Sequence, residues 1–173
     1  DAKAYLEKLE ELKKRIGGNR ELEQKIEKEI AITKAGIIGE DQILFELKNS
    51  GLNLVVLHDV FLEDPSGNGA QIDFLIITPY GNVFVECKNL FGNIEINNKG
   101  DFIRTMEYGA KTHKEGIYSP ITQNERHLRV FKECRKTQKS FLANIFFEKN
   151  FENYNKSLIV LANPKTVVND RYA

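Results

Sequence analysis

Apolar residues recur at helical spacing over the first part of the chain and at strand-like spacing over its middle. The helical part has two short stripes on either side of a glycine break at residues 17–18: Tyr5, Leu9, Leu12 and Ile16, then Leu22, Ile26 and Ile30. Stripes of this kind, joined by a tight turn, predict a helical hairpin or coiled-coil arm over residues 1–33. We expect such an arm to serve packing or homo-oligomer formation and to carry no chemistry.

Strand-like runs dominate after a further predicted helix at residues 36–47. They lie at residues 52–62, 70–78, 83–88, 91–96 and 101–105. Turn-forming residues at 79–81 and 97–100 predict two antiparallel hairpins among them. A helix is predicted from Pro120 to about Leu142. The continuous apolar run at residues 157–162 is typical of a strand buried on both faces in a parallel pairing after a crossover helix.

Composition limits the classes of protein to which the chain can belong, but it indicates no particular ligand. The 25 basic and 25 acidic residues cancel, so overall charge does not indicate a polyanionic partner. Two distant cysteines, Cys87 and Cys134, are no disulfide framework and favour a reducing, cytoplasmic location. Because no long apolar run is present, we expect no membrane contact within this segment. The chain starts without Met, and we expect a piece of a longer protein whose second unit here is one domain over residues 34–173.

Candidate chemistry lies in the hairpin of residues 70–88. Glu86 and Lys88 share one face of a strand, because side chains alternate across it. If the turn closes symmetrically over Thr78–Gly81, Asp73 falls directly opposite Glu86, with β-carbons roughly 4.5–5.5 Å apart. Two carboxylates placed so repel each other unless a cation lies between them. The pair therefore predicts a divalent metal site with Lys88 beside it, although Glu-x-Lys alone is common by chance on an exposed strand.

Mg²⁺ suits such a site, and Mn²⁺ is expected to substitute for it, because hard cations use carboxylates and water as ligands. Zinc is not indicated, since no cluster of histidine and cysteine is present. The three histidines are scattered along the chain, and we expect them to be surface or packing residues: His58, His113 and His127.

A basic stretch at residues 111–139 holds eight Lys or Arg against three acids. Five of these cations share one side of the predicted helix, opposite an apolar stripe: Arg126, Arg129, Lys132, Lys136 and Lys139. Such a side either follows a phosphate backbone or is an ordinary solvated face, and the sequence leaves both interpretations open. No motif indicates base readout, so we expect no strong sequence specificity.

The ordered set of motifs resembles the nuclease-related domain (NERD) family of the PD-(D/E)xK nuclease superfamily. The resemblance runs from about Lys34 to Ala162, and its motifs are Gly36-x-x-Gly39-Glu40, Gln71-Ile72-Asp73, Glu86-Cys87-Lys88-Asn89 with Gly92, and Pro120-x-x-Gln123. It implies an α/β fold with a restriction-endonuclease-like core. That core has a helix, a mixed sheet with an antiparallel meander, a crossover helix and a further strand, preceded here by the helical hairpin.

The resemblance also implies roles for single residues. Asp73 and Glu86 match the family's metal-binding acids, Lys88 the catalytic lysine, and Glu40 the helix acid that supports or completes the metal site. Gln71 and Gln123 match polar residues near the site. The implied function is a Mg²⁺-dependent nuclease, with DNA favoured over RNA and internal over terminal cleavage, in DNA processing or in defence against foreign DNA. A non-cleaving nucleic-acid-binding or assembly module on the same fold is the alternative.

Overall fold

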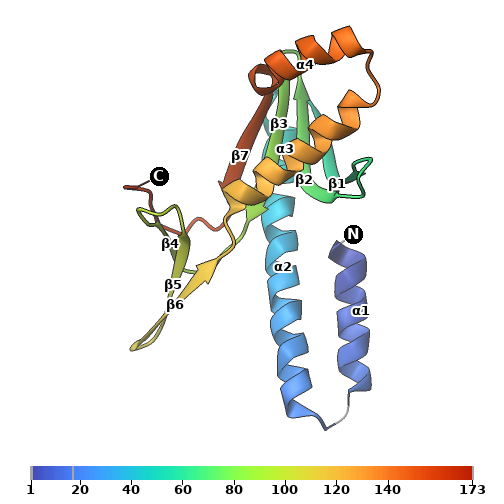
Figure 1. The fold of residues 1–173 in the computed structure, drawn as a ribbon. Helices are drawn as coiled ribbons and strands as arrows, with labels where there is room; N and C mark the ends of the chain where they lie inside the picture. Colours follow the sequence, from blue (N-terminus) through green and yellow to red (C-terminus); the bar gives the residue numbers. More distant parts are fainter. Residues whose placement is uncertain (1, 17, 173) are drawn as a thin grey trace.

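A computed structural model describes residues 2–16 and 18–172, and its helices and strands form an arm, a core and a wing (Figure 1). In chain order the elements are α1 (Ala2–Arg15), α2 (Arg20–Asn49), β1 (Val55–Glu63), β2 (Gly69–Thr78), β3 (Gly81–Lys88), β4 (Asn93–Ile96), β5 (Phe102–Tyr108), β6 (Lys111–Ile117), α3 (Pro120–Lys136), α4 (Phe141–Tyr154), β7 (Asn155–Leu161) and β8 (Val168–Asn169). Within the described residues no helix is both long and apolar enough to cross a bilayer.

The arm is the predicted helical hairpin, in which α1 packs along α2. Leu9 and Ile26 are buried between the two helices. Ion pairs join Lys13 to Glu27 at 2.7 Å and Lys34 to Glu10 at 2.8 Å across the hairpin. Two helices leave part of each apolar stripe in solvent, and the exposed members are Tyr5, Leu12 and Leu22.

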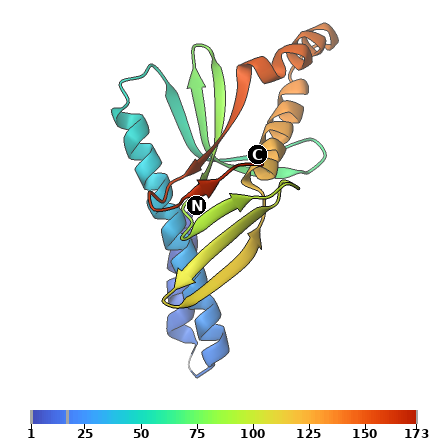
Figure 2. The same cartoon turned by 90° about the vertical axis from the view of Figure 1, so that its left-hand side faces the viewer.

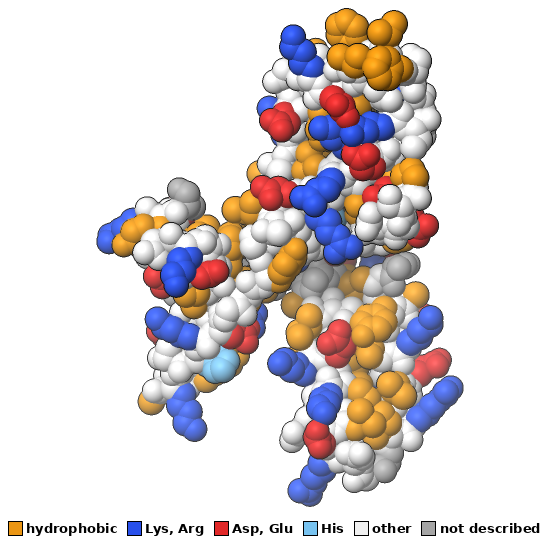
Figure 3. Space-filling model, viewed as in Figure 1, with side chains coloured by type: hydrophobic (Ala, Val, Ile, Leu, Met, Phe, Trp, Pro, Cys, Tyr) orange, Lys and Arg blue, Asp and Glu red, His pale blue; other side chains and the backbone are white. Residues whose placement is uncertain are grey.

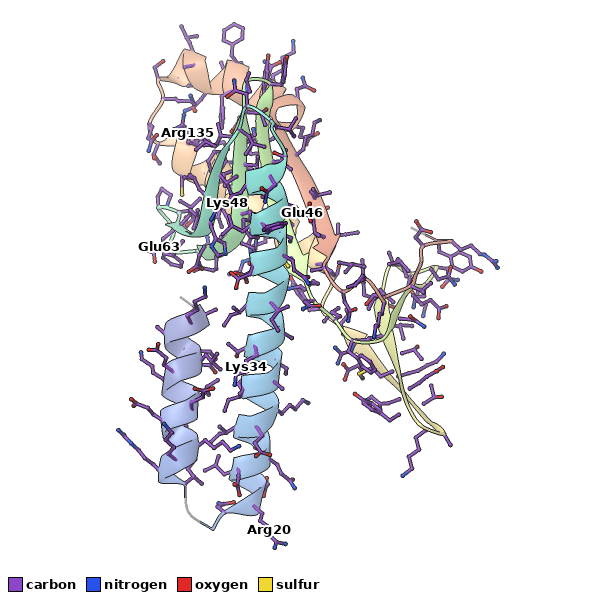
Figure 4. The ribbon with its side chains drawn as sticks, turned by 180° about the vertical axis from the view of Figure 1, so that it is seen from behind. Arg20, Lys34, Glu46, Lys48, Glu63 and Arg135 are labelled. Carbon is purple, nitrogen blue, oxygen red and sulfur yellow. The ribbon has the colours of Figure 1, made fainter. Side chains whose placement is uncertain are left out.

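The arm and the core share one continuous helix, where the sequence predicted two. The 30-residue α2 runs through Gly36 and Gly39 and ends at Asn49 (Figure 4). An interior glycine costs about 1 kcal/mol relative to alanine, which tertiary contacts can offset. At Gly39 the reason for glycine is space, because a Cβ there would lie 2.7 Å from the Cβ of Asn89. The expected boundary between residues 33 and 34 therefore falls inside α2.

The core sheet has the strand order β1-β2-β3-β7, with β1, β2 and β3 antiparallel and β7 parallel to β3. The predicted hairpin register is confirmed, since Leu75 pairs with Phe84 and Thr78 with Gly81. Helix α2 covers one face of the sheet around Phe74, and α3 covers the other around Phe84. These layers confirm the predicted α/β class with its meander, crossover helix and parallel strand.

Two further predicted elements differ from the structure, which also holds a strand, β6, that was not predicted. Strand β7 lies at an edge of its sheet, and Leu158 is 47 % exposed, so the strand is not buried on both faces. The helix expected to reach Leu142 ends at Lys136, and after a turn α4 begins at Phe141. Strand β6 was not predicted, because its residues Lys111–Ile117 are mostly polar and exposed and show no alternation.

The wing is a second sheet of strand order β6-β5-β4-β8. It stands apart from the core sheet and lies below it in Figure 2. A cluster of Ile94, Ile96 and Phe102 packs with Leu161 at the end of β7, which joins the wing to the core. Strands β4, β5 and β6 of the wing lie in the chain between β3 and α3, and β8 joins them after β7.

Candidate active site between β2 and the end of β3

Asp73 lies where the regular pairing of β2 breaks on both sides. The β1–β2 ladder pairs His58 with Phe74 and Val60 with Ile72 but omits the opposed residues Asp59 and Asp73. Asp59 has a φ of 57°, an uncommon value for a residue other than glycine. On the other side the β2–β3 ladder ends at Phe74 and Val85, one step before Asp73 and Glu86.

This break turns the Asp73 carboxylate toward the backbone of β3. Its Oδ2 accepts a hydrogen bond from the backbone N–H of Cys87 at 2.7 Å. Burial raises the pKa of Asp73, while the Cys87 N–H works in the opposite direction and the nearby charge of Glu40 adds to the rise. The sequence analysis expected Asp73 directly opposite Glu86, whereas the regular pairing stops at Phe74 and Val85, so the two acids lie one step beyond the ladder.

Glu86 is almost fully buried on the face of β3 that α3 covers. Burial and the neighbouring Asp73 raise the pKa of Glu86 to about 7, against the opposing effect of Lys88. Two acids with raised pKa values on adjacent strands show that the metal-free site holds two negative charges poorly. A perturbed carboxylate pair of this kind is a frequent mark of a functional site.

Lys88 connects the strand to helix α3. Its Nζ donates to Oε1 of Glu86 at 2.5 Å and to Oε1 of Gln123 at 3.1 Å. Gln123 lies in the first turn of α3, a helix that Ser119 caps by accepting from the N–H of Thr122. The cap and the following Pro120 fix where the helix begins, and so place Gln123 beside the lysine.

Glu40 approaches the site from α2. Its Oε2 lies 2.7 Å from Nε2 of His58, and the imidazole ring stacks on Phe74 with centroids 4.6 Å apart. Because Phe74 precedes the break at Asp73, this stack ties the helix acid to the same stretch of β2. The charge of Glu40 also adds to the rise in the pKa values of Asp73 and Glu86.

His127 faces Glu86 from α3. Its Nδ1 lies 3.6 Å from Oε2 of Glu86, and the side chain is almost completely buried. Burial lowers the pKa of His127, and the charges of Arg126 and Lys88 lower it further. Neither Nδ1 of His127 nor Oε2 of Glu86 has a hydrogen-bond partner among the described residues.

Gln71 is exposed and lies apart from the acids and the lysine described above. Its Nε2 donates to Oδ1 of Asp59, on the neighbouring strand. The bond connects β2 to the residue with positive φ that lies opposite Asp73. Gln71 therefore contacts the break in the ladder.

The basic side of α3 is divided among several partners. Lys136 pairs with Glu133 and Glu148, while Lys132 and Lys139 lie over the rings of Phe151 and Phe147. Lys139 also lies beyond the helix end, so it does not share the helical face that the sequence predicted. Arg126 and Arg129 are exposed and border a hollow of about 380 Å³ with Asp64, Ser66 and Asn68, and Arg126 also donates to the backbone oxygen of Gly69 at 3.1 Å.

The donor set fits a hydrated hard cation better than a metal enclosed by protein ligands. No group of three His, Cys, Asp or Glu within residues 2–16 and 18–172 is arranged to hold a metal ion. Mg²⁺ is commonly bound through one or two carboxylates with water completing its shell. Oε2 of Glu86, buried and without a protein partner, is a ready ligand of that kind. Burial raises the pKa of the Cys87 thiol to about 12, so we do not expect Cys87 to supply a thiolate ligand.

Sequence reasoning missed the two histidines that meet the acids. His58 and His127 were expected to be surface or packing residues, yet one contacts Glu40 and the other faces Glu86. The spacing of His127 after Gln123, one helical turn along α3, is a signal that could have found it. His58 offers no such signal, because its partner is 18 residues away on another element.

A family model described as nuclease-related domain matches residues 35–162 of the chain. The matched stretch contains every acid and lysine of the site described above. The curated proteins and the solved structures gave no match.

Proposed function

This chain belongs to the nuclease-related domain family, within the PD-(D/E)xK-like nuclease group, and we propose that it is a Mg²⁺-dependent nuclease acting on DNA. The observation that supports this proposal most strongly is the junction of Asp73, Glu86 and Lys88. Asp73 raises the pKa of the buried Glu86, and Lys88 donates to the Glu86 carboxylate from two residues along the strand. A structural role alone does not explain a pair of acids with raised pKa values at a break in the sheet.

Asp73 and Glu86 would hold Mg²⁺, with Glu40 supporting the site from α2. When bound, the ion supplies Lewis acidity toward the phosphate and lowers the pKa of a coordinated water. Mn²⁺ would serve in its place, because it accepts the same oxygen ligands. The chain's own part would be to supply the Glu86 carboxylate as a ligand while His58 fixes the orientation of Glu40.

Lys88 would meet the substrate phosphate. An ammonium group has three N–H donors, and among the described residues Lys88 directs them at Glu86 and Gln123, which leaves one for a phosphate oxygen. Its positive charge then lies where negative charge grows during phosphodiester hydrolysis. Gln123 acts as a positioning residue, because it holds the amine from α3.

Exposed Arg126 and Arg129 would contact the phosphate backbone beyond the cleaved bond. Contacts to phosphates do not distinguish one base from another, so we propose cleavage without strong sequence specificity. We also propose that cleavage occurs at internal phosphodiester bonds and not at the ends of a strand. Both cysteines are free thiols, which supports a reducing, cytoplasmic setting. Within that setting, DNA processing or defence against foreign DNA would use such an activity.

The competing proposal is a module that binds nucleic acid, or assembles, without cutting. The absence of a three-ligand metal group among the described residues favours it. The intact Glu86-x-Lys88 pair favours cleavage.

One assay separates the two proposals. Supercoiled, linear and single-stranded DNA are each incubated with the protein in Mg²⁺, in Mn²⁺ and in EDTA. A nuclease nicks or linearises the supercoiled form in either metal and leaves it intact in EDTA. Binding by gel shift without any cleavage in either metal contradicts the nuclease proposal and supports the binding module.

A further inference from the structure

Two exposed aromatic rings of the wing lie in contact, one just before β4 and the other at the end of β5. Phe91 is 54 % exposed and Tyr108 is 59 % exposed. Their ring centroids are 5.8 Å apart, and the planes are tilted by 38°. Single exposed apolar residues are ordinary on a protein surface, but a contacting pair of large rings keeps two broad faces in water.

The chain ties this pair closely to the candidate active site. Phe91 follows Lys88 by three residues, so their Cα atoms are at most about 11 Å apart. Gly92, directly after the phenylalanine, has a φ of 102°, and a Cβ there would lie 2.4 Å from the backbone oxygen of Thr105. The backbone at Phe91 is therefore pressed against β5 and has little freedom to move away from the site.

The second ring is held just as firmly. The hydroxyl of Tyr108 donates to Sδ of Met106 at 3.4 Å, and Met106 is buried. In the β5–β6 register Tyr108 pairs directly with Lys111, so the two side chains leave the same face of the wing. An exposed ammonium thus accompanies the exposed ring, within reach of anything that lies against it.

We propose that Phe91 and Tyr108 form a stacking platform for the bases of a single-stranded stretch of nucleic acid, close to the point of cleavage. The proposal rests on the proposed function and adds a substrate class to it. Aromatic faces accompanied by a cation are the usual means of holding single strands, because every base offers a π-face while the backbone offers charge. In a duplex those faces are covered by neighbouring base pairs, so the platform would select unpaired strands, flaps or frayed ends.

The wing is placed to present the platform in this way. It leaves the core where β3 ends at Lys88 and returns where α3 begins (Figure 1). Viewed from the same side, the molecular surface is hollowed between the wing and the arm below the core (Figure 3). A strand that reaches Lys88 at the end of β3 would then meet Phe91, three residues farther along the chain.

Binding is measured by fluorescence anisotropy in EDTA, where cleavage is blocked, with labelled oligothymidylate and with a hairpin duplex of matched length. We expect Phe91→Ala and Tyr108→Ala each to weaken binding of the single strand about tenfold, since one stacked base contributes roughly 1–3 kcal/mol. Duplex binding should change less than twofold. Phe146→Ala on α4, a ring that is 70 % exposed, is the control and should match the parent.

A second probe isolates stacking from charge. When the thymines are replaced by abasic residues, parent and alanine variants should bind alike, because only the backbone remains. Tyr108→Phe retains a ring and should bind the thymine strand as the parent does, which keeps the test valid if an alanine variant unfolds.

The outcomes separate this proposal from the one on which it rests. Suppose that the parent cleaves DNA and that Phe91→Ala and Tyr108→Ala bind the single strand as tightly as Phe146→Ala does. That result overturns the platform proposal alone. An equal loss on the abasic strand also overturns it, because stacking cannot cause that loss. A parent that neither binds nor cleaves any nucleic acid overturns the proposed function and the platform together.

Discussion

Nδ1 of His127 and Oε2 of Glu86 face each other at 3.6 Å in the buried space between α3 and β3. That separation is too long for a direct hydrogen bond. The charged form of the imidazole is disfavoured there, because burial and the charges of Arg126 and Lys88 lower the pKa of His127. The main positive charge next to Glu86 is therefore that of Lys88. Burial and Asp73 still raise the pKa of Glu86 to about 7.

The metal-free protein should lose stability as pH rises through this range. The pKa of Glu86 rises from an ordinary 4.5 to about 7 on folding, so its stabilising contribution is complete below 4.5 and disappears as pH approaches and passes 7. One pKa unit corresponds to about 1.4 kcal/mol, so the loss is on the order of 3 kcal/mol. Glu86→Gln does not titrate and should lack this loss.

Denaturant unfolding in EDTA at pH 5 and pH 8 measures the effect as the difference between parent and variant. The lowered pKa of His127 affects both proteins and cancels in that difference. Glu107→Gln, an exposed change on β5, serves as the surface control. A parent-to-Gln difference that is the same at both pH values would contradict the prediction.

Metal binding should stabilise the parent and not the variants that lose a ligand charge. Asp73→Asn and Glu86→Gln relieve the repulsion between the two acids, so each should be at least as stable as the parent in EDTA. Asparagine can still accept from the N–H of Cys87. Neither variant should cleave DNA.

Melting curves with EDTA and with increasing Mn²⁺ should show a shift that grows with the logarithm of concentration in the parent alone. Equal shifts in all three proteins would place the ion elsewhere.

Loss of the Lys88 ammonium should remove cleavage and spare binding. Lys88→Ala deletes one charged donor near the phosphate, and a loss of at least about 100-fold in cleavage rate is expected from a single donor of this kind. DNA affinity in EDTA should remain within a few-fold, because most binding comes from contacts away from the bond that breaks. Lys114→Ala, an exposed lysine change on β6, is the control. A Lys88→Ala protein that cuts as fast as its parent would refute the assignment.

The structure separates two cations of α3 that the sequence treated alike. Arg129 is exposed beside the 380 Å³ hollow, whereas Lys136 is occupied by Glu133 and Glu148. We expect Arg129→Ala to reduce the slope of log affinity against log salt by about 0.9, the value for one duplex phosphate contact. Lys136→Ala should leave the slope unchanged. The opposite result would reverse the roles of the two residues.

We propose that the arm supports homo-oligomer formation. Leu12 is 46 % exposed and Leu22 is 41 % exposed, so the hairpin does not cover its own apolar surface. Light scattering of the parent over a range of concentrations should show an increase in mass that Leu12→Lys or Leu22→Lys abolishes. Phe146→Lys on α4 is the comparison. If only the α4 change dissociates the protein, the arm is not the interface.

Short-range pattern in the sequence already determined the centre of the site. Alternation along each strand places Glu86 and Lys88 on one face, and the turn at Thr78–Gly81 fixes the register, as the pairing of Leu75 with Phe84 confirms. These relationships depend on the pleat and on the length of one turn, both of which are local. The break in strand pairing at Asp73 could not be predicted from the sequence, because it depends on Asp59 in another strand.

Tertiary structure decided the rest, because it depends on neighbours distant along the chain. Gly36 and Gly39 look like helix breakers, yet Gly39 is where α2 passes close to Asn89 and the helix continues. His58 and His127 gained their place at the site only when β1 and α3 packed against α2 and β3. Periodicity identifies which face of an element is apolar. The partner that each polar group finds is set by packing between elements, and no local pattern contains it.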